Sequence, residues 1–349
     1  MLNKLFKKFS RDIGIDLGTA NTLVYVKDKG IVINEPSVVA INTRNDQIIT
    51  VGNEAKQMLG KTPPHIVVTK PLTSGIISDF EVAEKMLKYF VEKIHEDGFS
   101  FITRPRVVVS VPLEATEVEI KAVEDVLFSA GAREVNIVHT TMAAAIGARM
   151  PIEGPIGNML VSIGAGSTEV SVISLSGIVV WRASKVAGDE MNKNIIQYAR
   201  EVFNLFVGES QAEQIKIRVG SVLENKEKME FPLRGRDVVT GLPREVMVKD
   251  AHIRESLERS IETIVDLIKT ALEMTPPELT ADIHERGLLL TGGGALLRGM
   301  DQMIAKATAV PVRVGDDPMS SVVRGAGQLL DNFELLRAVR IPSARHKKN

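Results

Sequence analysis

Three glycine-rich turns in this sequence have the residue types that bind phosphate groups. Residues 17–22 and 163–168 combine glycine with Thr, Ser or Asn, and the glycines at 292–294 precede a stretch with helical spacing. Glycine lets the backbone approach an anion without a Cβ clash, and hydroxyl side chains add donors to the backbone N–H groups. N–H groups at the start of a helix would support the third turn. One such turn alone is usually only a tight turn, but each of the three follows an apolar run typical of a strand. Together they predict phosphate binding.

The first two turns belong to a repeated pattern. Residues 12–26 and 159–173 both alternate apolar with small or polar residues on either side of the turn, which predicts strand, turn, strand. Gly18 follows Asp16 by two positions, as Gly164 follows Ser162. We infer an internal duplication with one hairpin in each half. This arrangement favours a ligand cleft between two domains.

The periodicity of the remaining chain predicts both strands and helices. Strands are expected at 31–41, 48–52, 106–112 and 134–138, and helices at 80–96, 116–130, 142–150 and 256–274. Residues 185–235 are mostly polar and are expected to be helical. A strand at 286–294 is expected to run directly into a helix at 295–307.

The composition limits the classes of function. The chain has 349 residues, enough for about two domains. Its 43 Lys and Arg nearly balance 44 Asp and Glu, and only 4% of residues are aromatic, which argues against a nucleic-acid partner. The absence of cysteine excludes disulfides and thiolate sites. No apolar run approaches the ~18 residues of a membrane span.

The first residues of the chain have the pattern of an amphipathic helix. At ~100° per residue, one face carries Leu2, Leu5, Phe6 and Phe9, and the opposite face carries three lysines. A helix of this kind lies in the plane of a membrane surface. The alternative is a frayed, solvated end. A second apolar group, Phe99 and Phe101, lies in an otherwise polar connection, where such side chains usually pack inward.

Several longer motifs resemble one known family. They are DLGTANT at 16–22, VAGDEM at 186–191, RGRDVVTGLP at 234–243 and LTGGGALLRG at 290–299, supported by MAAAIGA at 142–148 and TPPEL at 275–279. In sequence and order they are similar to the MreB family of bacterial actin homologues, from about residue 12 to about residue 330. The resemblance implies an α/β, actin-like (ribonuclease H-like) duplicated two-domain fold with an interdomain nucleotide cleft.

The resemblance also implies a division of the chain. Residues 1–11 would be the membrane-binding segment, and 12–147 the first domain, with a small insertion at about 33–75. Residues 148–315 would be the second domain, with a helical subdomain at about 185–243. Residues 316–349 would return to the first domain and end in a basic tail. The loop carrying Phe99 and Phe101 would touch lipid beside the N-terminal helix.

The nucleotide site is assigned residue by residue on the same resemblance. ATP, with GTP as the alternative, would bind with Mg²⁺, and Asp16 would orient water around the cation. The phosphate-binding residues would be Thr19, Ala20 and Asn21 in the first domain and Gly164, Gly166, Ser167 and Thr168 in the second. Glu213 and Lys216 would face the nucleoside, although without the resemblance they are typical of a solvated helix face. Gly293, Gly294, Ala295 and Leu296 would border the adenine.

Three positions depart from the family pattern. Ser162 stands where the family usually has an aspartate, and Ala165 where it has a glycine. Thr140 stands where a glutamate is thought to orient the attacking water. Threonine cannot act as a carboxylate base, and such a loss costs ~10²–10⁴-fold in rate. Thr140 has the alternative role of a helix N-cap, and His139 is expected to be a surface or packed residue.

The leading functional hypothesis is an ATP-binding, filament-forming cytoskeletal protein in the cytoplasm, on the inner face of the bacterial membrane. It would organise cell-wall synthesis and rod shape. Its partners by resemblance would be further copies of itself, membrane lipid, RodZ, MreC, MreD and the elongation machinery. The alternative is a hydrolysis-impaired paralogue that co-assembles with or caps filaments of a related protein. A sugar kinase or a 70-kDa heat-shock chaperone on the same fold is disfavoured, because neither a sugar-site motif nor a peptide-binding domain is recognised.

Overall fold

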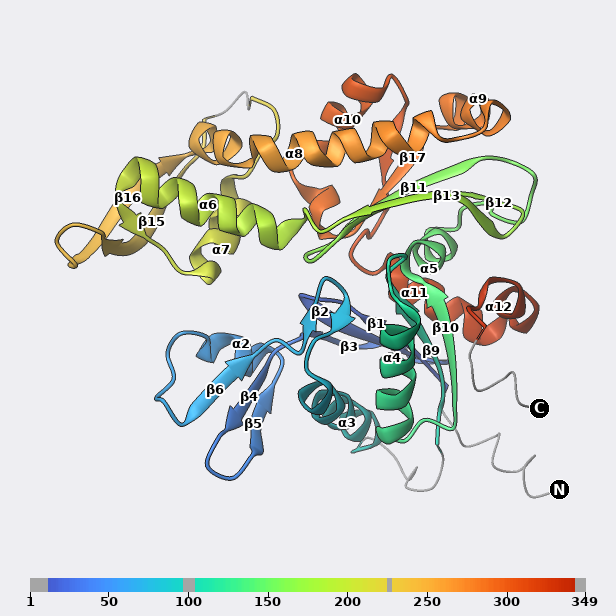
Figure 1. Cartoon of the computed structure of the whole chain (residues 1–349), viewed down its shortest axis with the longest axis horizontal. Coiled ribbons are helices and arrows are strands. Elements are labelled where there is room, and N and C mark those ends of the chain that lie inside the picture. The colour runs from blue at the N-terminus through green and yellow to red at the C-terminus, as the bar shows by residue number, and fades with distance from the viewer. Residues whose placement is uncertain (1–11, 97–103, 225–227, 343–349) are drawn as a thin grey trace. The chain divides into compact units, whose positions relative to one another are not determined.

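A computed structural model of the chain describes residues 12–96, 104–224 and 228–342 (Figure 1). The chain forms two compact units. Unit 1 falls within Met1–Pro155, Ser174–Ile178 and Met319–Asn349, and unit 2 comprises Ile156–Ile173 and Val179–Pro318. The finer boundaries expected from the sequence stay predictions. No helix among the described residues is long and apolar enough to cross a membrane.

Unit 1 is built on a five-stranded mixed sheet. Its strands, in spatial order, are β10 (Glu134–His139), β9 (Arg106–Val111), β1 (Ile13–Leu17), β2 (Asn21–Val26) and β3 (Gly30–Pro36). The strands β10, β9 and β1 are parallel, whereas β2 is antiparallel to both β1 and β3. The carboxyl ends of the three parallel strands therefore lie at one edge of the sheet.

Unit 2 repeats this plan. Its strands, in spatial order, are β18 (Val312–Val314), β17 (Leu288–Thr291), β11 (Asn158–Ile163), β12 (Thr168–Ser174) and β13 (Gly177–Ser184). The parallel pairs β11–β17 and β17–β18 and the antiparallel pair β11–β12 match their counterparts in unit 1. The two hairpins also close alike, with Leu17 opposite Thr22 and Ile163 opposite Thr168. The predicted internal duplication is confirmed.

Helices cover the sheet of unit 1. They are α3 (Phe80–Glu96), α4 (Glu117–Ser129), α5 (Thr140–Gly147), α11 (Ser321–Asp331) and α12 (Phe333–Val339). The helices α5 and α11 cross where both have glycine. A Cβ on Gly147 would lie 1.9 Å from the Ser321 carbonyl oxygen, and one on Gly325 would lie 1.8 Å from that of Ala143. The small residues of α5 are thus required by this close packing.

A smaller sheet is inserted into unit 1 after β3. It contains β5 (Gln47–Val51), β4 (Val39–Asn42) and β6 (Ile66–Thr69), with the short helix α2 (Asn53–Met58) beside it and the hairpin β7 (Leu72–Thr73)–β8 (Ile76–Ile77) after it. The single strand expected at 31–41 is wrong. It is divided at Ser37 into β3 and β4, which belong to different sheets.

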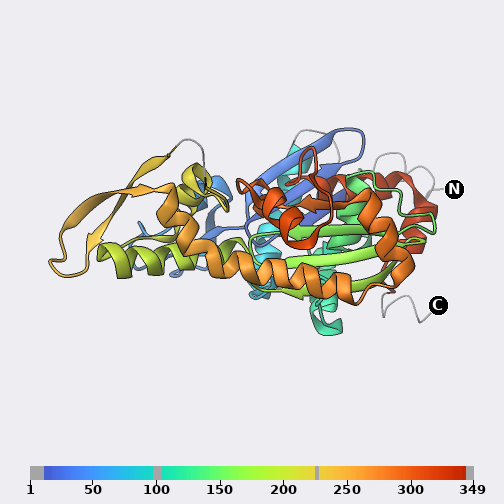
Figure 2. The ribbon, with the colours of Figure 1, turned by 90° about the horizontal axis from the view of Figure 1, so that it is seen from above.

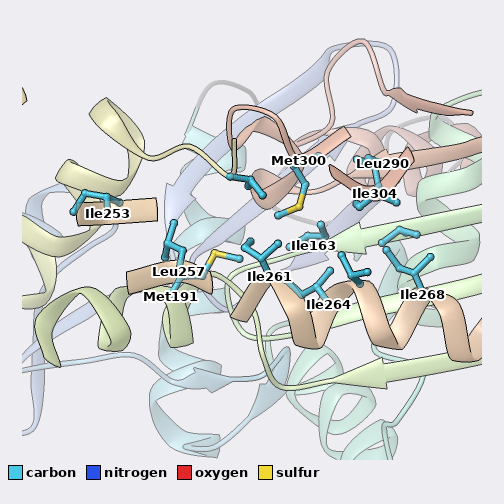
Figure 3. Close-up of a cluster of buried hydrophobic side chains, with 14 of the residues drawn as sticks. Ile163, Met191, Ile253, Leu257, Ile261, Ile264, Ile268, Leu290, Met300 and Ile304 are labelled. Atoms are coloured by element: carbon cyan, nitrogen blue, oxygen red, sulfur yellow. The ribbon is translucent and has the colours of Figure 1, made fainter. Parts of the chain in front are cut away.

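Unit 2 has a core between its sheet and its helices. The helices are α6 (Gly188–Phe203), α7 (Glu209–Val219), α8 (Asp250–Glu273), α9 (Pro277–Arg286) and α10 (Met300–Thr308). Buried α8 residues such as Ile261 and Ile264 point toward Ile163 of β11 (Figure 3). The long helix α8 runs from the end of β16 (Pro243–Lys249) to α9 (Figure 2).

Two expectations for unit 2 are wrong. Residues 185–235 are not helical throughout, because β14 (Leu205–Phe206) pairs with β15 (Glu230–Asp237), which pairs with β16, and the three strands form a sheet. The strand β17 does not run directly into a long helix. A 3-10 turn, η1 (Gly293–Leu296), comes first, and α10 begins only at Met300 because Gly299 adopts a left-handed conformation, with φ +78°.

Candidate functional site

The first hairpin presents a tight loop, residues 18–21, between β1 and β2. Gly18 is required there, because an added Cβ would lie 2.6 Å from the Asn21 carbonyl oxygen. Thr19 is 8% exposed, and its hydroxyl oxygen accepts the Gly75 N–H at 2.6 Å. The Ala20 carbonyl accepts the Ser37 N–H at 2.9 Å, and Asn21 begins β2. The three predicted phosphate-binding residues thus form one braced loop.

Asp16 lies on β1 just before this loop, at the carboxyl edge of the parallel strands. Its Oδ1 lies 3.5 Å from the Ser110 hydroxyl on β9. Burial raises the pKa of Asp16 to about 7, although the Ser110 hydrogen bond acts in the opposite direction. Desolvation dominates because a carboxylate loses water that one weak hydrogen bond cannot replace. A nearby cation would return this group to its ionised form.

His139 ends β10 at the same edge, and Thr140 follows it. Thr140 is the first residue of α5, and His139, in an extended conformation, occupies the N-cap position. The N-cap alternative for Thr140 is therefore wrong. His139 is half-buried, its Nδ1 is buried without a hydrogen-bond partner, and burial lowers its pKa. The imidazole is thus neutral at pH 7, as expected of a packed histidine rather than a charged one.

The second hairpin has a loop of the same length, residues 164–167. The Gly164 N–H bonds the Ser167 carbonyl at 2.9 Å and closes the loop. The start of α6 supports it from outside, since Gly188 and Asp189 donate their N–H groups to the Gly164 and Ala165 carbonyls. Ser162 pairs with Glu169, just as Asp16 pairs with Leu23. The register therefore places Ser162 at the position of Asp16.

The predicted nucleoside residues of unit 2 lie on α7 and η1. Glu213 and Lys216 are partly exposed on α7, and Lys216 donates from Nζ to the Gly188 carbonyl at 2.7 Å. Lys216 therefore lies beside the second phosphate hairpin. The end of α7 is joined to the segment after η1, because Val222 donates its N–H to the Arg298 carbonyl at 2.8 Å and Arg298 donates to the Arg218 carbonyl.

The glycines at η1 have different surroundings. A Cβ on Gly294 would lie 2.2 Å from Ile163 Cγ2, and one on Gly292 would lie 2.4 Å from the Ile163 carbonyl oxygen. A Cβ on Gly293 would meet nothing within 4 Å. Gly292 and Gly294 are therefore required by packing on β11, whereas Gly293 faces open space. Ala295 is buried, and Leu296 is 56% exposed.

The side chains available to a cation are few. No group of three or more His, Cys, Asp or Glu residues that could hold a metal ion occurs in the described part of the chain. A single carboxylate, Asp16, fits a Mg²⁺ ion that keeps its own waters better than a dedicated protein cage. The predicted membrane-binding residues Leu2, Leu5, Phe6 and Phe9, and also Phe99 and Phe101, lie outside the described residues.

Sequence reasoning missed several residues that support the site. Ser37, Ser110 and Gly75 contact the first hairpin from distant points in the chain, and no sequence pattern marks them. Gly188 lies in the VAGDEM motif, which supported the family resemblance but received no role. Its N–H donates to the Gly164 carbonyl, so the motif supports the second hairpin loop.

Comparison with known proteins places the chain in a family. The family model "MreB/Mbl protein" matches residues 10–338. The chain is 46% identical over 328 residues to the cell shape-determining protein Mbl of Bacillus subtilis (strain 168), covering 94% of this chain and 98% of that protein. It is also 46% identical over 341 residues to the cell shape-determining protein MreB of Escherichia coli (strain K12), covering 96% and 97%.

Solved structures agree. The structure of MreB 5 of Spiroplasma citri bound to AMPPNP matches with a TM-score of 0.89 at 35% identity, covering 93% of this chain and 97% of that one. The MamK double helical filament matches with a TM-score of 0.77 at 20% identity, which supports the fold alone. The expected actin-like, duplicated two-domain α/β fold is confirmed, and the chain belongs to the MreB/Mbl family.

Proposed function

We propose that this chain is an ATP-binding, actin-like cytoskeletal protein that forms membrane-associated filaments. These filaments would organise cell-wall synthesis and determine rod cell shape. One observation carries the proposal. Two hairpins of identical closure, one in each unit, present glycine loops of the kind that bind phosphate. The cell shape-determining names of the 46% identical relatives support the cellular role.

The glycine loops would hold phosphate groups. Thr19, Ala20 and Asn21 would donate from the first loop, and Gly164, Gly166, Ser167 and Thr168 would contribute from the second. A MreB structure 35% identical to this chain is bound to AMPPNP, and a second is bound to ADP, which supports a nucleotide ligand. Mg²⁺, when bound, would neutralise phosphate charge, and Asp16 would orient its water shell as a carboxylate.

The nucleoside would lie against unit 2. Glu213 and Lys216 on α7 would face it, and the open position at Gly293 leaves room for a base to approach the backbone of η1. Gly294, Ala295 and Leu296 would complete the adenine side. ATP is the proposed ligand and GTP the alternative.

The alternative proposal is a hydrolysis-impaired paralogue that co-assembles with or caps filaments of a related protein. Two observations favour it. The register places Ser162 where unit 1 has Asp16, and Thr140 begins α5 where the family usually has a glutamate. Hydroxyl groups can hydrogen-bond a water but cannot remove its proton as a carboxylate can. Loss of both carboxylates would slow turnover while the loops still hold the nucleotide.

Membrane and partner binding complete the proposal. The apolar face of residues 1–11, with Phe99 and Phe101, would bind the inner face of the cell membrane. The protein would assemble with further copies of itself, and RodZ, MreC, MreD and the elongation machinery would be its partners. A filament presents many weak anchors at once, so avidity would hold it firmly to lipid.

Electron microscopy of the purified protein on anionic liposomes tests this function. With ATP and Mg²⁺ we expect filaments on the lipid surface, and phosphate release measured on the same sample separates an active from an impaired protein. Filaments with negligible phosphate release would favour the paralogue. Failure to form any assembly with ATP, on liposomes or in solution, would contradict a cytoskeletal role.

A further inference from the structure

Ser37 is a fully buried serine between β3 and β4, where the chain leaves the main sheet of unit 1 for the small sheet. It makes three hydrogen bonds to the first hairpin. Its N–H donates to the Ala20 carbonyl at 2.9 Å, and its Oγ lies 2.6 Å from the Gly18 carbonyl oxygen and 2.9 Å from the Thr22 hydroxyl.

The donors in this group can be assigned from the number of protons. A serine hydroxyl has one proton, and the Ser37 hydroxyl donates it to the Gly18 carbonyl. Thr22 must therefore be the donor in the bond between the two hydroxyls. One side chain thus joins Gly18, which follows β1, to Thr22 on β2, while the Ser37 backbone holds Ala20 between them. The loop cannot open without breaking these bonds.

A second contact reaches the same loop from the other end of the small sheet. Gly75 lies in the turn between β7 and β8, the hairpin that follows the small sheet in the chain. It donates its N–H to the Thr19 hydroxyl at 2.6 Å. Glycine is required there, because φ is +76° and a Cβ would lie 2.7 Å from Pro112 Cγ. Thr19 uses only a lone pair in this bond, so its own proton stays available for a phosphate oxygen.

The second hairpin has a different support. The Thr168 hydroxyl donates to the Val186 carbonyl at 2.8 Å, and the first N–H groups of α6 bond the carbonyls of Gly164 and Ala165. These partners belong to the segment that leads into a core helix of unit 2. Of the two loops, only the first is therefore bonded to the chain segments that lead into and out of a separate small sheet.

We propose that Ser37 is a positioning residue for the first phosphate loop and that, together with the Gly75 N–H, it couples phosphate binding at this loop to the small sheet β5–β4–β6. The inference rests on the proposed nucleotide binding. A phosphate that accepts the Thr19 proton polarises the hydroxyl oxygen and strengthens the bond from Gly75. Both chain connections of the small sheet are then held more firmly when the loop is occupied.

Three variants of the full chain test this coupling. Ser37→Ala removes the hydroxyl that joins the two strands, and Thr22→Val removes only the donor to that hydroxyl while keeping the branched shape. Thr43→Val is the matched control, because Thr43 donates to the His65 carbonyl at 3.2 Å within the small-sheet region and does not contact the loop. MgADP affinity is measured by calorimetry, and amide hydrogen exchange of β4 and β6 is measured with and without MgADP.

In the unaltered protein we expect MgADP to slow exchange in β4 and β6. Ser37→Ala should bind MgADP about three- to tenfold more weakly, the loss of one net hydrogen bond, and should lose most of the slowing. Thr22→Val should show the same loss to a smaller degree, and it decides the question if Ser37→Ala does not fold. Thr43→Val should keep the difference made by MgADP.

Different results would overturn different claims. If Ser37→Ala speeds exchange equally with and without MgADP, Ser37 only stabilises the fold and the inference is wrong. If the unaltered protein binds MgADP without any change in β4 and β6, the coupling alone is excluded. If the unaltered protein does not bind MgADP at all, the proposed function fails, and this inference fails with it.

Discussion

The carboxyl group of Asp16 destabilises the ligand-free protein when it ionises. Burial raises its pKa from 3.8 to about 7, so between these values the folded protein keeps a proton that the unfolded chain releases. The free energy of unfolding that the protonated Asp16 carboxyl contributes is therefore lost as the pH rises, and this loss levels off above pH 7. Asp16→Asn cannot ionise. We expect its free energy of unfolding to exceed that of the unaltered protein by on the order of 1–2 kcal/mol at pH 8.

Urea unfolding at several pH values measures this difference, which should shrink toward pH 5. A difference that does not vary with pH would exclude ionisation of Asp16 as its cause. Adding MgADP should reverse the order of stability, since an amide cannot replace the proposed carboxylate beside the cation's waters.

Gly293 and Gly294 are adjacent glycines with opposite expected effects on substitution. Gly293→Val adds a side chain in open space, so the unfolding temperature without nucleotide should not change. Nucleotide affinity should fall about tenfold or more, because the side chain would occupy the space for the base. Gly294→Ala is the matched control. Its Cβ would clash with Ile163 and cost ~1–3 kcal/mol with or without nucleotide. Equal stabilisation of Gly293→Val and the unaltered protein by nucleotide would remove Gly293 from the site.

At the scale of helices and strands, the sequence predicts elements with a strong periodic signal. The expected helix at 80–96 is α3, because its apolar residues recur at helical spacing. The helix expected at 116–130 is α4, where Thr116 and Glu119 form a capping box. Alternating apolar residues on either side of a glycine turn predict the hairpins β1–β2 and β11–β12. The same patterns predict the two phosphate loops, which lie in the turns.

Other elements have only a weak periodic pattern in the sequence, or none. In β15 and β16 the alternation is short. Leu233 and Val248 are buried, Phe231 and Val246 are partly buried against the same core, and the remaining side chains are exposed or half-exposed. The break before α10 depends on the left-handed conformation of Gly299, which composition alone does not specify. Within the site, Ser37 and Gly75 contact loop 18–21 through tertiary folding, and a local pattern cannot indicate such contacts.

The strand–helix junction β10–α5 and the hairpin β11–β12 carry the prediction on hydrolysis. Thr140→Glu and Ser162→Asp together should raise kcat ~10²-fold or more while changing nucleotide affinity little, because carboxylates act mainly on the transition state. Each single change should achieve much less, since groups that act as a unit are not additive. Phosphate release under single-turnover conditions measures this.

The register of β11 and β12 also predicts that the double variant is less stable. Ser162→Asp places a carboxyl group directly opposite Glu169, and like charges across a strand pair are destabilising. The double variant should therefore unfold at a lower temperature than the unaltered protein. If the unaltered protein already releases phosphate as fast as the double variant, Thr140 and Ser162 do not limit hydrolysis, and another residue must position the water.

For the whole molecule, the repeated sheets predict that nucleotide stabilises both units. Each unit has its own core and its own glycine loop, so nucleotide bound at a loop would stabilise the unit that carries it. At a hundredfold excess over Kd, ATP or ADP with Mg²⁺ should add ~2.7 kcal/mol to the free energy of unfolding. Calorimetry with and without nucleotide, with EDTA as the control for Mg²⁺, measures the gain. Absence of any gain at millimolar nucleotide would remove the basis of the proposed site.

On the proposed function, the N-terminal segment would hold the whole molecule at the membrane. Burial of four large apolar side chains in lipid contributes up to ~1.5–3 kcal/mol each, and each lysine adds ~1 kcal/mol on anionic lipid. Ordering the segment costs ~1 kcal/mol or more per residue, so one copy would bind modestly and a proposed filament would bind firmly. Deleting residues 1–10, or combining Leu5→Glu with Phe6→Glu, should release the protein from anionic liposomes while nucleotide binding survives. The control is Asn3→Glu with Ser10→Glu, which adds the same charge outside the apolar face and should keep more of the binding. Liposome flotation with ATP measures all of these. If the truncated protein floats as well as the intact one, the segment is not the main anchor, and Phe99 and Phe101 become the next residues to change.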